Sequence, residues 1–590
     1  MNVLLFAPYS DIWLHSFLER SVANTLISKG CHVTWISCHG CLAPGCLVFD
    51  HRASGSSLNE TTDRICRACR SSSNILRKVS GADFVGLEDY LQNYEKSEIE
   101  ETVRSLADDE LFDFVYQGVK VGRYCTYDLV LKHKLSRRSD LSTYSMEWRN
   151  LLRQCMLSTL VCQKLIEERS FDVFLVHNNV YAVNRSVFET AHGAGVSARA
   201  LHSGPDFRKT SSSIVVFSDY KDHYGISRSL AWSEASGFPL SRKEVDSVRK
   251  NSEFLMRGKS PMIYSSPLKR VPESRLKRIR DLSKDKRIVL CLMSSTDEIF
   301  ASRVSGAFDQ QQLYGPESIF KSSEDWLSEV IRFCEESESL HLFIRPHPRE
   351  FSENRSRVSS KSIDRYYEIQ RMGSESVSIC WPSEQIPLYL LANQARVVLN
   401  HTSTAGIELA LMGLPVIVHD PKALFSYPIE VNISPKTKDE YWSSLIAALD
   451  SSLDFEKIIL AFRYRSFLFE RYAIDLSDVI KNRNNWTLQR VVTGLRDQKN
   501  FEYLSPIVNL TRKIEVKRYS EPCQENRILN SITSGSSLNV GITEMNNFSV
   551  EFEEIQRSLI YFAKILGDFN LSKSTHATRI RSQIGETKGF

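Results

Sequence analysis

The chain has 590 residues, which is too long for one hydrophobic core, so we expect two or three domains. Its 42% hydrophobic and 25% charged residues are typical of a soluble globular protein. The net charge of +4, from 75 basic and 71 acidic residues, is too near neutral to indicate a nucleic-acid partner.

The sequence carries no clear signal for membrane insertion or export. No stretch approaches the ~20 uninterrupted apolar residues of a transmembrane helix. The start, Met1–Pro8, has no basic region and too short an apolar run for a signal peptide. The 13 cysteines are an odd number in a large chain, which favours reduced thiols over disulfides. We therefore expect a cytoplasmic protein, with any membrane association peripheral.

The first residues predict a Rossmann-like half. Apolar runs at Val3–Ala7 and His32–Ser37 have the length of buried strands, and between them Trp13–Lys29 is an amphipathic helix that ends at Gly30. The loop after the first strand lacks G-x-G-x-x-G, so nothing marks a dinucleotide there.

A large, mostly helical insertion follows, from about residue 38 to 170. The sheet then resumes with strands Asp172–His177 and Ser197–His202 around a helix at Asn184–Ala194. From Phe238 to Lys286 the chain is basic and punctuated by prolines, which is typical of a segment that joins two domains.

A second alternation of strands and helices begins near residue 287. The expected strands are Arg287–Met293, Leu340–Arg345, Ser376–Cys380, Val397–Leu399 and Pro415–Val418. The expected helices are Glu324–Glu335, Pro387–Ala392, Ile407–Met412, Glu440–Leu449 and Phe455–Tyr472. Beyond Lys499 the pattern weakens: we expect a linker or disorder over Ser520–Asn547 and one helix at Ser549–Leu566. The predicted domains are residues 1–270, residues 271–498 and a partly disordered extension, residues 499–590.

Two stretches of the second domain favour an anion site. The turn His401–Gly406 places hydroxyls and a glycine at a helix N-terminus, where free backbone N–H groups and the helix dipole attract phosphate. The strand Leu340–Arg345 delivers Arg345, His347 and Arg349 to its C-terminal end, where ligands sit in an open parallel sheet.

These motifs carry a resemblance to a known family. R-P-H-P-R-E (Arg345–Glu350), H-T-S-T-A-G-I-E (His401–Glu408) and G-L-P-V-I-V (Gly413–Val418) together resemble bacterial capsule and surface polysaccharide glycosyltransferases, including those that use CMP-Kdo or CMP-sialic acid. The resemblance is firm over residues 287–421, weak over the first 270 and absent after 499. It implies a GT-B fold, in which two Rossmann-like domains with parallel sheets face a cleft.

The resemblance implies roles for individual residues. His347-Pro348 and Ser403-Thr404 match the family's nucleotide-holding His-Pro motif and Ser/Thr pair, with His347 also a catalytic donor to the leaving group. Glu408 would bind ribose, although a first-turn glutamate favoured by the helix dipole is the simpler alternative. The remaining residues predicted to bind the nucleotide-sugar are Ser294, Ser295, Asp297, Glu298, Arg345, His401 and Gly406. For the Ser294–Glu298 loop and for the Ser403-Thr404 pair, a helix cap is the structural alternative.

The catalytic base should come from the first domain, from a histidine or carboxylate at a strand end. The candidates are Asp11, His15, His202 and Asp206, with His177 also at a strand end. If the reaction retains configuration, a carboxylate could act as nucleophile instead. No metal or other cofactor is expected for catalysis.

Five cysteines crowd into residues 38–69. They form C-x-x-C-x4-C followed by C-x-x-C, and the spacing approaches that of a zinc ribbon. We predict a structural Zn²⁺ held by Cys38, Cys46, Cys66 and Cys69, against the alternative of buried free thiols.

The predicted function is transfer of a sugar from a nucleotide-activated donor, with CMP-Kdo favoured, to a glycan or lipid-linked acceptor of a bacterial surface polysaccharide. A CDP-glycerol-type polyol phosphate transferase shares the His-Pro motif and is the first alternative. An inactive GT-B-like scaffold of a polysaccharide assembly complex is the second. The protein would be cytoplasmic or peripheral at the inner membrane, with no nucleic-acid partner.

Overall fold

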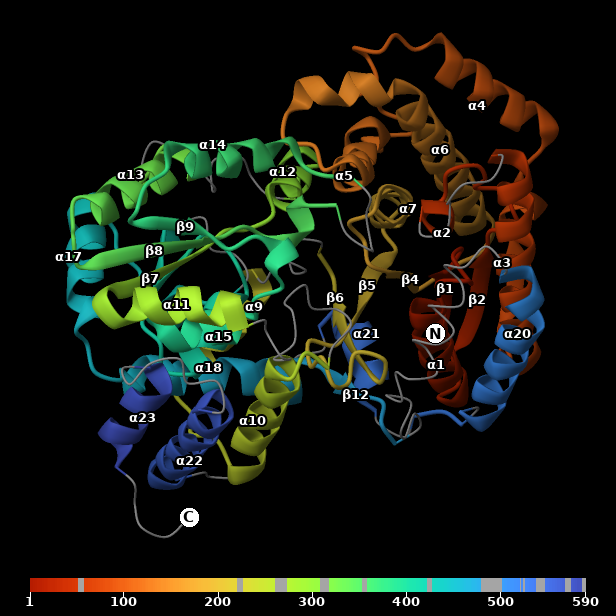
Figure 1. The fold of residues 1–590 in the computed structure, drawn as a ribbon. Helices are drawn as coiled ribbons and strands as arrows, with labels where there is room; N and C mark the ends of the chain where they lie inside the picture. Colours follow the sequence, from red (N-terminus) through yellow and green to blue (C-terminus); the bar gives the residue numbers. More distant parts are fainter. Residues whose placement is uncertain are drawn as a thin grey trace. The chain divides into compact units, whose positions relative to one another are not determined.

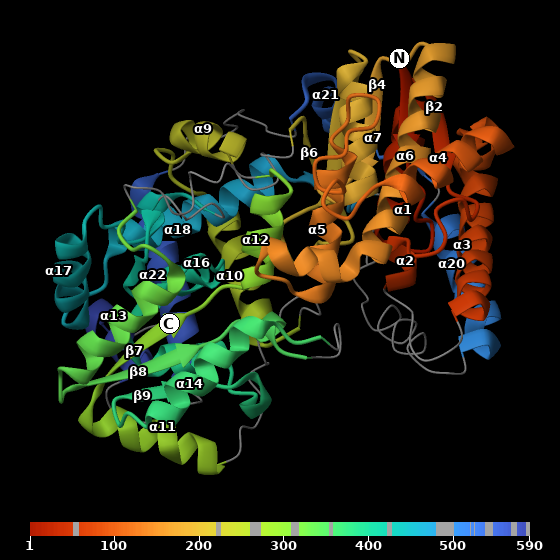
Figure 2. The ribbon, with the colours of Figure 1, turned by 90° about the horizontal axis from the view of Figure 1, so that it is seen from above.

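A computed structural model describes residues 1–50, 58–219, 226–259, 273–307, 318–352, 358–421, 427–478, 501–519, 521–523, 526–536, 547–567 and 575–585. The chain forms two compact units (Figures 1 and 2). Unit 1 comprises Met1–His223, Phe300–Ala307 and Arg471–Asn539, and unit 2 comprises Tyr224–Ile299, Phe308–Glu470 and Val540–Phe590.

Unit 1 contains a seven-stranded sheet in the order β12-β6-β5-β4-β1-β2-β3. Its strands are β1 (Asn2–Phe6), β2 (His32–Ser37), β3 (Asp83–Gly86), β4 (Val173–His177), β5 (Ser197–Ser203), β6 (Ser213–Phe217) and β12 (Ile474–Asp475). From β5 to β3 neighbouring strands run parallel, while β6 pairs antiparallel with both β5 and β12. The central strands are apolar and buried because helices cover both faces of the sheet.

The helices of unit 1 come from both ends of the chain. They are α1 (Trp13–Ser28), α2 (Leu47–Asp50), α3 (Leu58–Ser80), α4 (Asn93–Ser105), α5 (Val121–His133), α6 (Ser145–Glu168), α7 (Ala182–Gly193), α20 (Phe501–Arg518) and α21 (Arg527–Ser534). One core joins the sheet to residues of α1, α3, α20 and α21. The helical character of the predicted insertion is therefore present, but β3 within it extends the sheet, a strand too short to stand out in the sequence.

Unit 2 contains a five-stranded, fully parallel sheet in the order β11-β10-β7-β8-β9. Its strands are β7 (Arg287–Leu292), β8 (Leu340–Arg345), β9 (Val377–Ile379), β10 (Ala395–Asn400) and β11 (Val416–Val418). Its helices are α9 (Ile226–Ala235), α10 (Arg242–Met256), α11 (Glu273–Asp285), α13 (Ser323–Glu335), α14 (Asp364–Met372), α15 (Leu388–Gln394), α16 (Ala405–Leu411), α17 (Lys438–Leu449), α18 (Phe455–Ser466), α22 (Phe548–Gly567) and α23 (His576–Ile584), with α12 (Thr296–Val304) beginning in this unit. Residues of α13, α14 and α17 share one apolar core with the sheet.

The predicted α/β class with two Rossmann-like domains, the components of a GT-B fold, is confirmed by these two sheets. Whether the two sheets face a common cleft stays a prediction. The unit boundaries differ from the predicted domain ranges: the segment expected to join the domains contains α10 and α11, and both belong to unit 2.

The C-terminal extension is also divided between the units. Helices α20 and α21 pack on unit 1, and α22 and α23 pack on unit 2. Helix α21 lies where the sequence predicted a linker, over Ser520–Asn547. A buried ion pair of 2.5 Å between Arg463 and Glu551 ties α22 to α18, a contact that local sequence does not reveal.

Candidate active site

Each sheet has one topological switch point, where the chain stops adding strands on one side and continues on the other. In unit 1 it lies between β1 and β4, and in unit 2 between β7 and β10. Loops diverge at the carboxyl ends of such strand pairs, which is where open α/β sheets bind ligands. Most of the predicted site residues lie on the loops that follow these four strands and β8.

At the unit 2 switch point, hydrogen bonds join the loops after β7 and β10. The Ser294 hydroxyl accepts the Thr402 backbone N–H at 3.0 Å and lies 2.8 Å from the Thr402 hydroxyl, which donates to it. Both residues are buried. Ser294 therefore fixes the shape of the predicted phosphate turn. Thr402 is part of the motif but was missed as a functional residue.

An ion pair joins the loop after β7 to the loop after β8. Arg349 lies 3.0 Å from Asp297, whose carboxylate is fully buried and also accepts the Ser295 hydroxyl. Arg349 lies 3.5 Å from the exposed Glu298 as well. Asp297 is thus held by both Ser295 and Arg349, while the Glu298 side chain is exposed to solvent.

Glu350 forms a second link between the same two loops. Its fully buried carboxylate accepts the Thr296 hydroxyl at 2.5 Å and the Tyr366 hydroxyl at 3.1 Å, with Arg365 at 3.6 Å. Sequence reasoning assigned no role to Glu350, although it ends the R-P-H-P-R-E motif. Together with the Asp297–Arg349 pair, it makes the loops after β7 and β8 one rigid edge.

His347 stands half-buried at the end of this edge. Its Nδ1 accepts the Arg349 backbone N–H at 3.3 Å, and Pro348 begins the 3-10 helix Pro348–Glu350 immediately after it. Because Nδ1 is the acceptor, the neutral ring carries its proton on Nε2, which is then a hydrogen-bond donor.

Ser403 and Thr404 form the turn between β10 and α16. The Ser403 hydroxyl accepts a hydrogen bond from the Ala405 backbone N–H at 3.2 Å. Ser403 therefore caps the helix, which is the structural alternative considered for this residue. Thr404 is exposed, and its side chain makes no capping hydrogen bond. Asn400, the last residue of β10, stabilises the turn through its side-chain amide. Its Oδ1 accepts a hydrogen bond from the Ser403 backbone N–H, and its Nδ2 donates to the Ser403 carbonyl oxygen.

Gly406 is required by close packing. A Cβ at this position would lie 2.0 Å from the Tyr427 hydroxyl and 2.4 Å from Nδ2 of Asn400. Those two groups are hydrogen-bonded at 2.8 Å, and Tyr427 donates onward to Asn432. The network was missed by sequence reasoning, for which Asn400 as the last strand residue before the turn was the available signal.

Three predicted binding residues are engaged within the protein. His401 is buried and stacked on His419 at 4.3 Å, and burial lowers the pKa of His401 well below its usual range, so the ring is neutral at pH 7. Glu408 accepts the Tyr389 hydroxyl at 2.7 Å, and burial raises the pKa of the Glu408 carboxyl. Arg345 donates to the Ile386 carbonyl oxygen at 2.8 Å. These contacts stabilise the fold of the site, and the ligand roles of the three stay predictions.

At the carboxyl-end edge of the unit 1 sheet, both predicted carboxylates are held in ion pairs. Asp11, after β1, lies 2.6 Å from Arg512 of α20 and accepts the Ser72 hydroxyl at 3.0 Å, with Asp11 and Arg512 almost fully buried. Asp206, after β5, accepts hydrogen bonds from the guanidinium of Arg208, the shortest at 2.6 Å, and one from the Arg208 backbone N–H at 2.9 Å. A carboxylate neutralised in this way is a poor base or nucleophile.

Three histidines from separate elements form a stack at the same edge. The rings of His15 and His177 lie 3.9 Å apart at 19°, and those of His177 and His202 lie 5.9 Å apart at 23°. His177 is buried in the middle, while His15 and His202 are half-buried. Nδ1 of His202 is 2.9 Å from the Ser203 carbonyl oxygen, which only accepts, so Nδ1 carries the proton and Nε2 is the basic nitrogen.

Asn179 adds an amide to this edge that the sequence did not indicate. It is fully buried two residues after β4, and neither its nitrogen nor its oxygen has a hydrogen-bond partner among the described residues. Burying an unsatisfied amide is costly. The arrangement therefore favours a polar ligand or water beside the histidine stack.

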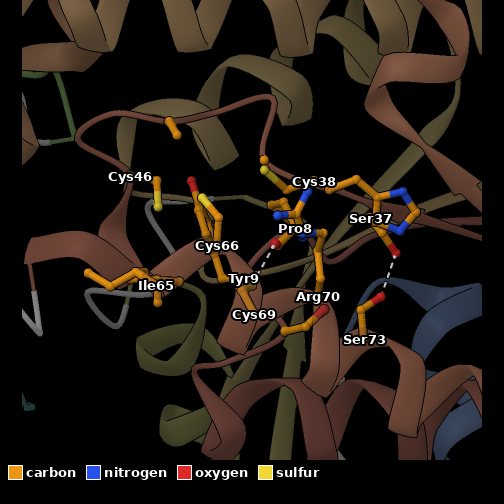
Figure 3. Close-up of a pocket in the computed structure, with 15 residues that line it drawn as sticks. Pro8, Tyr9, Ser37, Cys38, Cys46, Ile65, Cys66, Cys69, Arg70 and Ser73 are labelled. Atoms are coloured by element: carbon orange, nitrogen blue, oxygen red, sulfur yellow. Dashed lines mark hydrogen bonds between the residues drawn. The ribbon is translucent and has the colours of Figure 1, made fainter. Parts of the chain in front are cut away.

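The predicted zinc cysteines line one cavity of about 20 Å³, room for about one water molecule (Figure 3). Cys38 follows β2, Cys46 precedes α2, and Cys66 and Cys69 lie on α3. Burial raises the pKa of the Cys69 thiol to about 12. In the part of the chain that the structure describes, no three His, Cys, Asp or Glu side chains are arranged to hold a metal ion. The structural zinc stays a prediction.

No helix within the described ranges has the length and apolar content needed to cross a bilayer. No family model and no curated protein matches this sequence.

The chain shows similarity to several solved structures. A UDP-GlcNAc 2-epimerase from Neisseria meningitidis bound to UDP-GlcNAc is 9% identical, with 81% of this chain and 98% of that chain covered and a TM-score of 0.26. The KpsC β-Kdo 2,4 transferase of Thermosulfurimonas dismutans is 14% identical over 49% of this chain and 79% of that chain, with a TM-score of 0.28. The spinosyn rhamnosyltransferase SpnG is 9% identical over 80% of this chain and 95% of that chain, with a TM-score of 0.23. Scores this low carry no functional conclusion, and the fold assignment rests on the two sheets themselves.

Proposed function

We propose that this chain is a glycosyltransferase that moves a sugar from a nucleotide-activated donor to a growing bacterial surface or capsular polysaccharide, with a CMP-sugar such as CMP-Kdo favoured. The observation that carries the proposal is the edge of unit 2, where the loops after β7, β8 and β10 are tied together at the switch point. The preference for CMP follows from the family resemblance of His347-Pro348 and Ser403-Thr404.

Unit 2 would bind the donor. The Nε2–H of His347 would donate to a phosphate oxygen as the bond between sugar and phosphate breaks, which stabilises the developing charge on the leaving nucleotide. Thr404, exposed at the neighbouring turn, offers a hydroxyl to the same phosphate. Arg349, held by Asp297, would add positive charge beside His347.

Unit 1 would bind the acceptor. With Asp11 and Asp206 held by arginines, the histidine stack supplies the base, and His202 is the best placed because its basic Nε2 is set by the Ser203 carbonyl. Nε2 would take the proton of the acceptor hydroxyl as that oxygen bonds to the anomeric carbon. The Asn179 amide would hydrogen-bond a polar group of the acceptor.

A nucleotide panel tests the donor site. CMP, CDP, UDP and GDP are each added to the purified chain, and the melting temperature is measured. We expect one nucleotide to raise it, the His347→Ala variant to lose this shift, and a control variant, His192→Ala at the exposed end of α7, to keep it. If no nucleotide produces a shift and no activated sugar is consumed, the enzyme proposal is refuted.

A second variant tests the base. His202→Gln should lower kcat by about 10²–10⁴-fold while keeping the nucleotide-induced shift, because it removes only the proton acceptor. Equal turnover in His202→Gln and the unmodified chain would exclude His202 as the base.

One observation favours the scaffold alternative. Both carboxylates predicted as catalytic in unit 1 are neutralised by arginines, as expected if no acceptor chemistry takes place there. A scaffold that still binds nucleotide would show the melting shift without turnover on any donor. With CDP-glycerol supplied as the donor, transfer of glycerol phosphate to an acceptor hydroxyl with release of CMP would instead identify the polyol phosphate transferase.

A further inference from the structure

Helix α20 exposes three large aliphatic side chains on one face. Ile507, Leu510 and Ile514 are 55%, 58% and 58% exposed, and their spacing of three and four residues aligns them along the helix. The opposite face of α20 packs against unit 1, since Val508 and Val516 are almost completely buried. The aliphatic stripe is therefore additional to what the fold of unit 1 requires.

Basic side chains surround this stripe. On α20 itself, Lys513, Lys517 and Arg518 are exposed beside Leu510 and Ile514. Helix α3 packs along α20, as both views show (Figures 1 and 2). Its exposed positions include four further cations: Arg67, Arg70, Arg77 and Lys78.

Acidic groups do little to balance these cations. Asp63 is the exposed acid of α3 among its described side chains, and Glu515 of α20 is half-buried, with its carboxylate accepting the Trp13 indole N–H at 2.6 Å. The pair of helices thus combines seven exposed cations with an exposed aliphatic stripe, although the whole chain carries only +4. On these two helices the exposed cations therefore outnumber the exposed described acids.

We propose that the α3–α20 surface docks on an anionic lipid bilayer. Aliphatic side chains of an interfacial helix insert at the boundary of headgroups and acyl chains, while Lys and Arg bind anionic headgroups. Two adjacent helices with their exposed sides outward give a broad surface, which suits a bilayer. This inference is independent of the nucleotide site, which lies in unit 2.

Vesicle co-sedimentation tests the docking. The full chain is mixed with vesicles of phosphatidylcholine alone or with about 30% phosphatidylglycerol, and bound protein is measured as salt is raised. We expect binding to the anionic vesicles at low salt, little to phosphatidylcholine, and release at high salt because exposed charges are screened.

Two variants separate the contributions. Replacing Arg67 and Arg70 by Gln should weaken binding about 25-fold, from about fivefold for each cation. The triple variant Ile507→Ser, Leu510→Ser, Ile514→Ser should weaken it at least about tenfold by removing the inserted area. Because all five side chains are exposed, both variants should keep the melting temperature and any nucleotide-induced shift of the unmodified chain.

Matched controls change exposed apolar residues elsewhere. Met146→Ser, 72% exposed on α6, and Ile446→Ser, 57% exposed on α17, should bind vesicles as the unmodified chain does. Equal loss in the controls, unchanged binding by both variants, or equal binding to neutral vesicles would overturn the proposal. Absence of binding to anionic vesicles would overturn it too and would leave the stripe as a protein contact.

Discussion

The buried ion pair between Asp11 and Arg512 gives the strongest prediction about stability. Arg512 Nη1 lies 2.6 Å from Asp11 Oδ1 and Nη2 lies 3.4 Å from the Asp11 carbonyl oxygen, while the guanidinium stands 4.7 Å from the Trp13 ring. The Arg512 side chain is 5% exposed and the Asp11 side chain is 1% exposed. Replacing Arg512 by Met would leave the Asp11 carboxylate buried without its cation, although the Ser72 hydroxyl would still donate to it.

The expected cost is about 3–5 kcal/mol, because removing one partner leaves an uncompensated buried charge. Asp11→Asn should cost a similar amount by leaving the guanidinium without its anion. The Asp11→Asn, Arg512→Met double variant should cost at least about 2 kcal/mol less than the sum of the two singles, since it removes both charges.

Urea unfolding of the four proteins, followed by Trp fluorescence and circular dichroism, measures these differences. Arg518→Met is the matched control, an exposed arginine on the same helix, and should change stability by less than about 0.5 kcal/mol. Strict additivity in the cycle, or a cost below about 1 kcal/mol for Arg512→Met, would show that this ion pair does not stabilise unit 1. It would also mean that α20 is not an integral part of unit 1.

Four further outcomes follow from single positions. Gly406→Ala should destabilise by about 1–3 kcal/mol, measured by urea unfolding, because its Cβ would meet the Tyr427 hydroxyl at 2.0 Å. Burial lowers the pKa of His419 to about 4 from about 6.5 unfolded, so stability should fall by about 3 kcal/mol as pH drops from 6.5 to 4, and His419→Gln should flatten this profile. Burial raises the pKa of Glu19 to about 8, so stability should fall as pH rises from 4.5 to 8, and Glu19→Gln should stabilise the chain by about 4 kcal/mol at pH 8, with no gain at pH 4. If the predicted zinc binds, elemental analysis finds about one Zn²⁺ per chain and Cys69→Ser loses it; metal-free protein that retains its melting temperature would contradict a structural role.

The sequence indicated the arrangement of the motif loops in unit 2 more directly than the contacts of the candidate residues in unit 1. In unit 2 the informative residues are local: His347-Pro348 closely follows β8, and Ser403-Thr404 closely follows β10. The carboxyl ends of parallel strands lie along one edge of a sheet, so the strand pattern alone predicts both motifs at that edge. The hydrogen bonds between Ser294 and Thr402, which join the loops after β7 and β10, agree with that expectation.

The local sequence could not reveal which distant residues bind the predicted site residues. Asp11 has the position of a catalytic carboxylate after the first strand, but its partner Arg512 is 501 residues away. Glu408 has the position of a ribose ligand, yet Tyr389 from α15 donates to it. Whether a carboxylate can act on a ligand depends on such contacts, which only packing decides.

The two Rossmann-like halves and the motif loops could be predicted from the sequence, because strand length, helical periodicity and turn residues are encoded locally. The division of the C-terminal segment between two units and the pairing of Asp11 with Arg512 depend on packing between distant segments. Such packing also forms the stack of His15, His177 and His202, whose members come from three separate elements. Each of these features depends on which helix covers which face of a sheet, and that choice is made by the burial of apolar area over the whole unit.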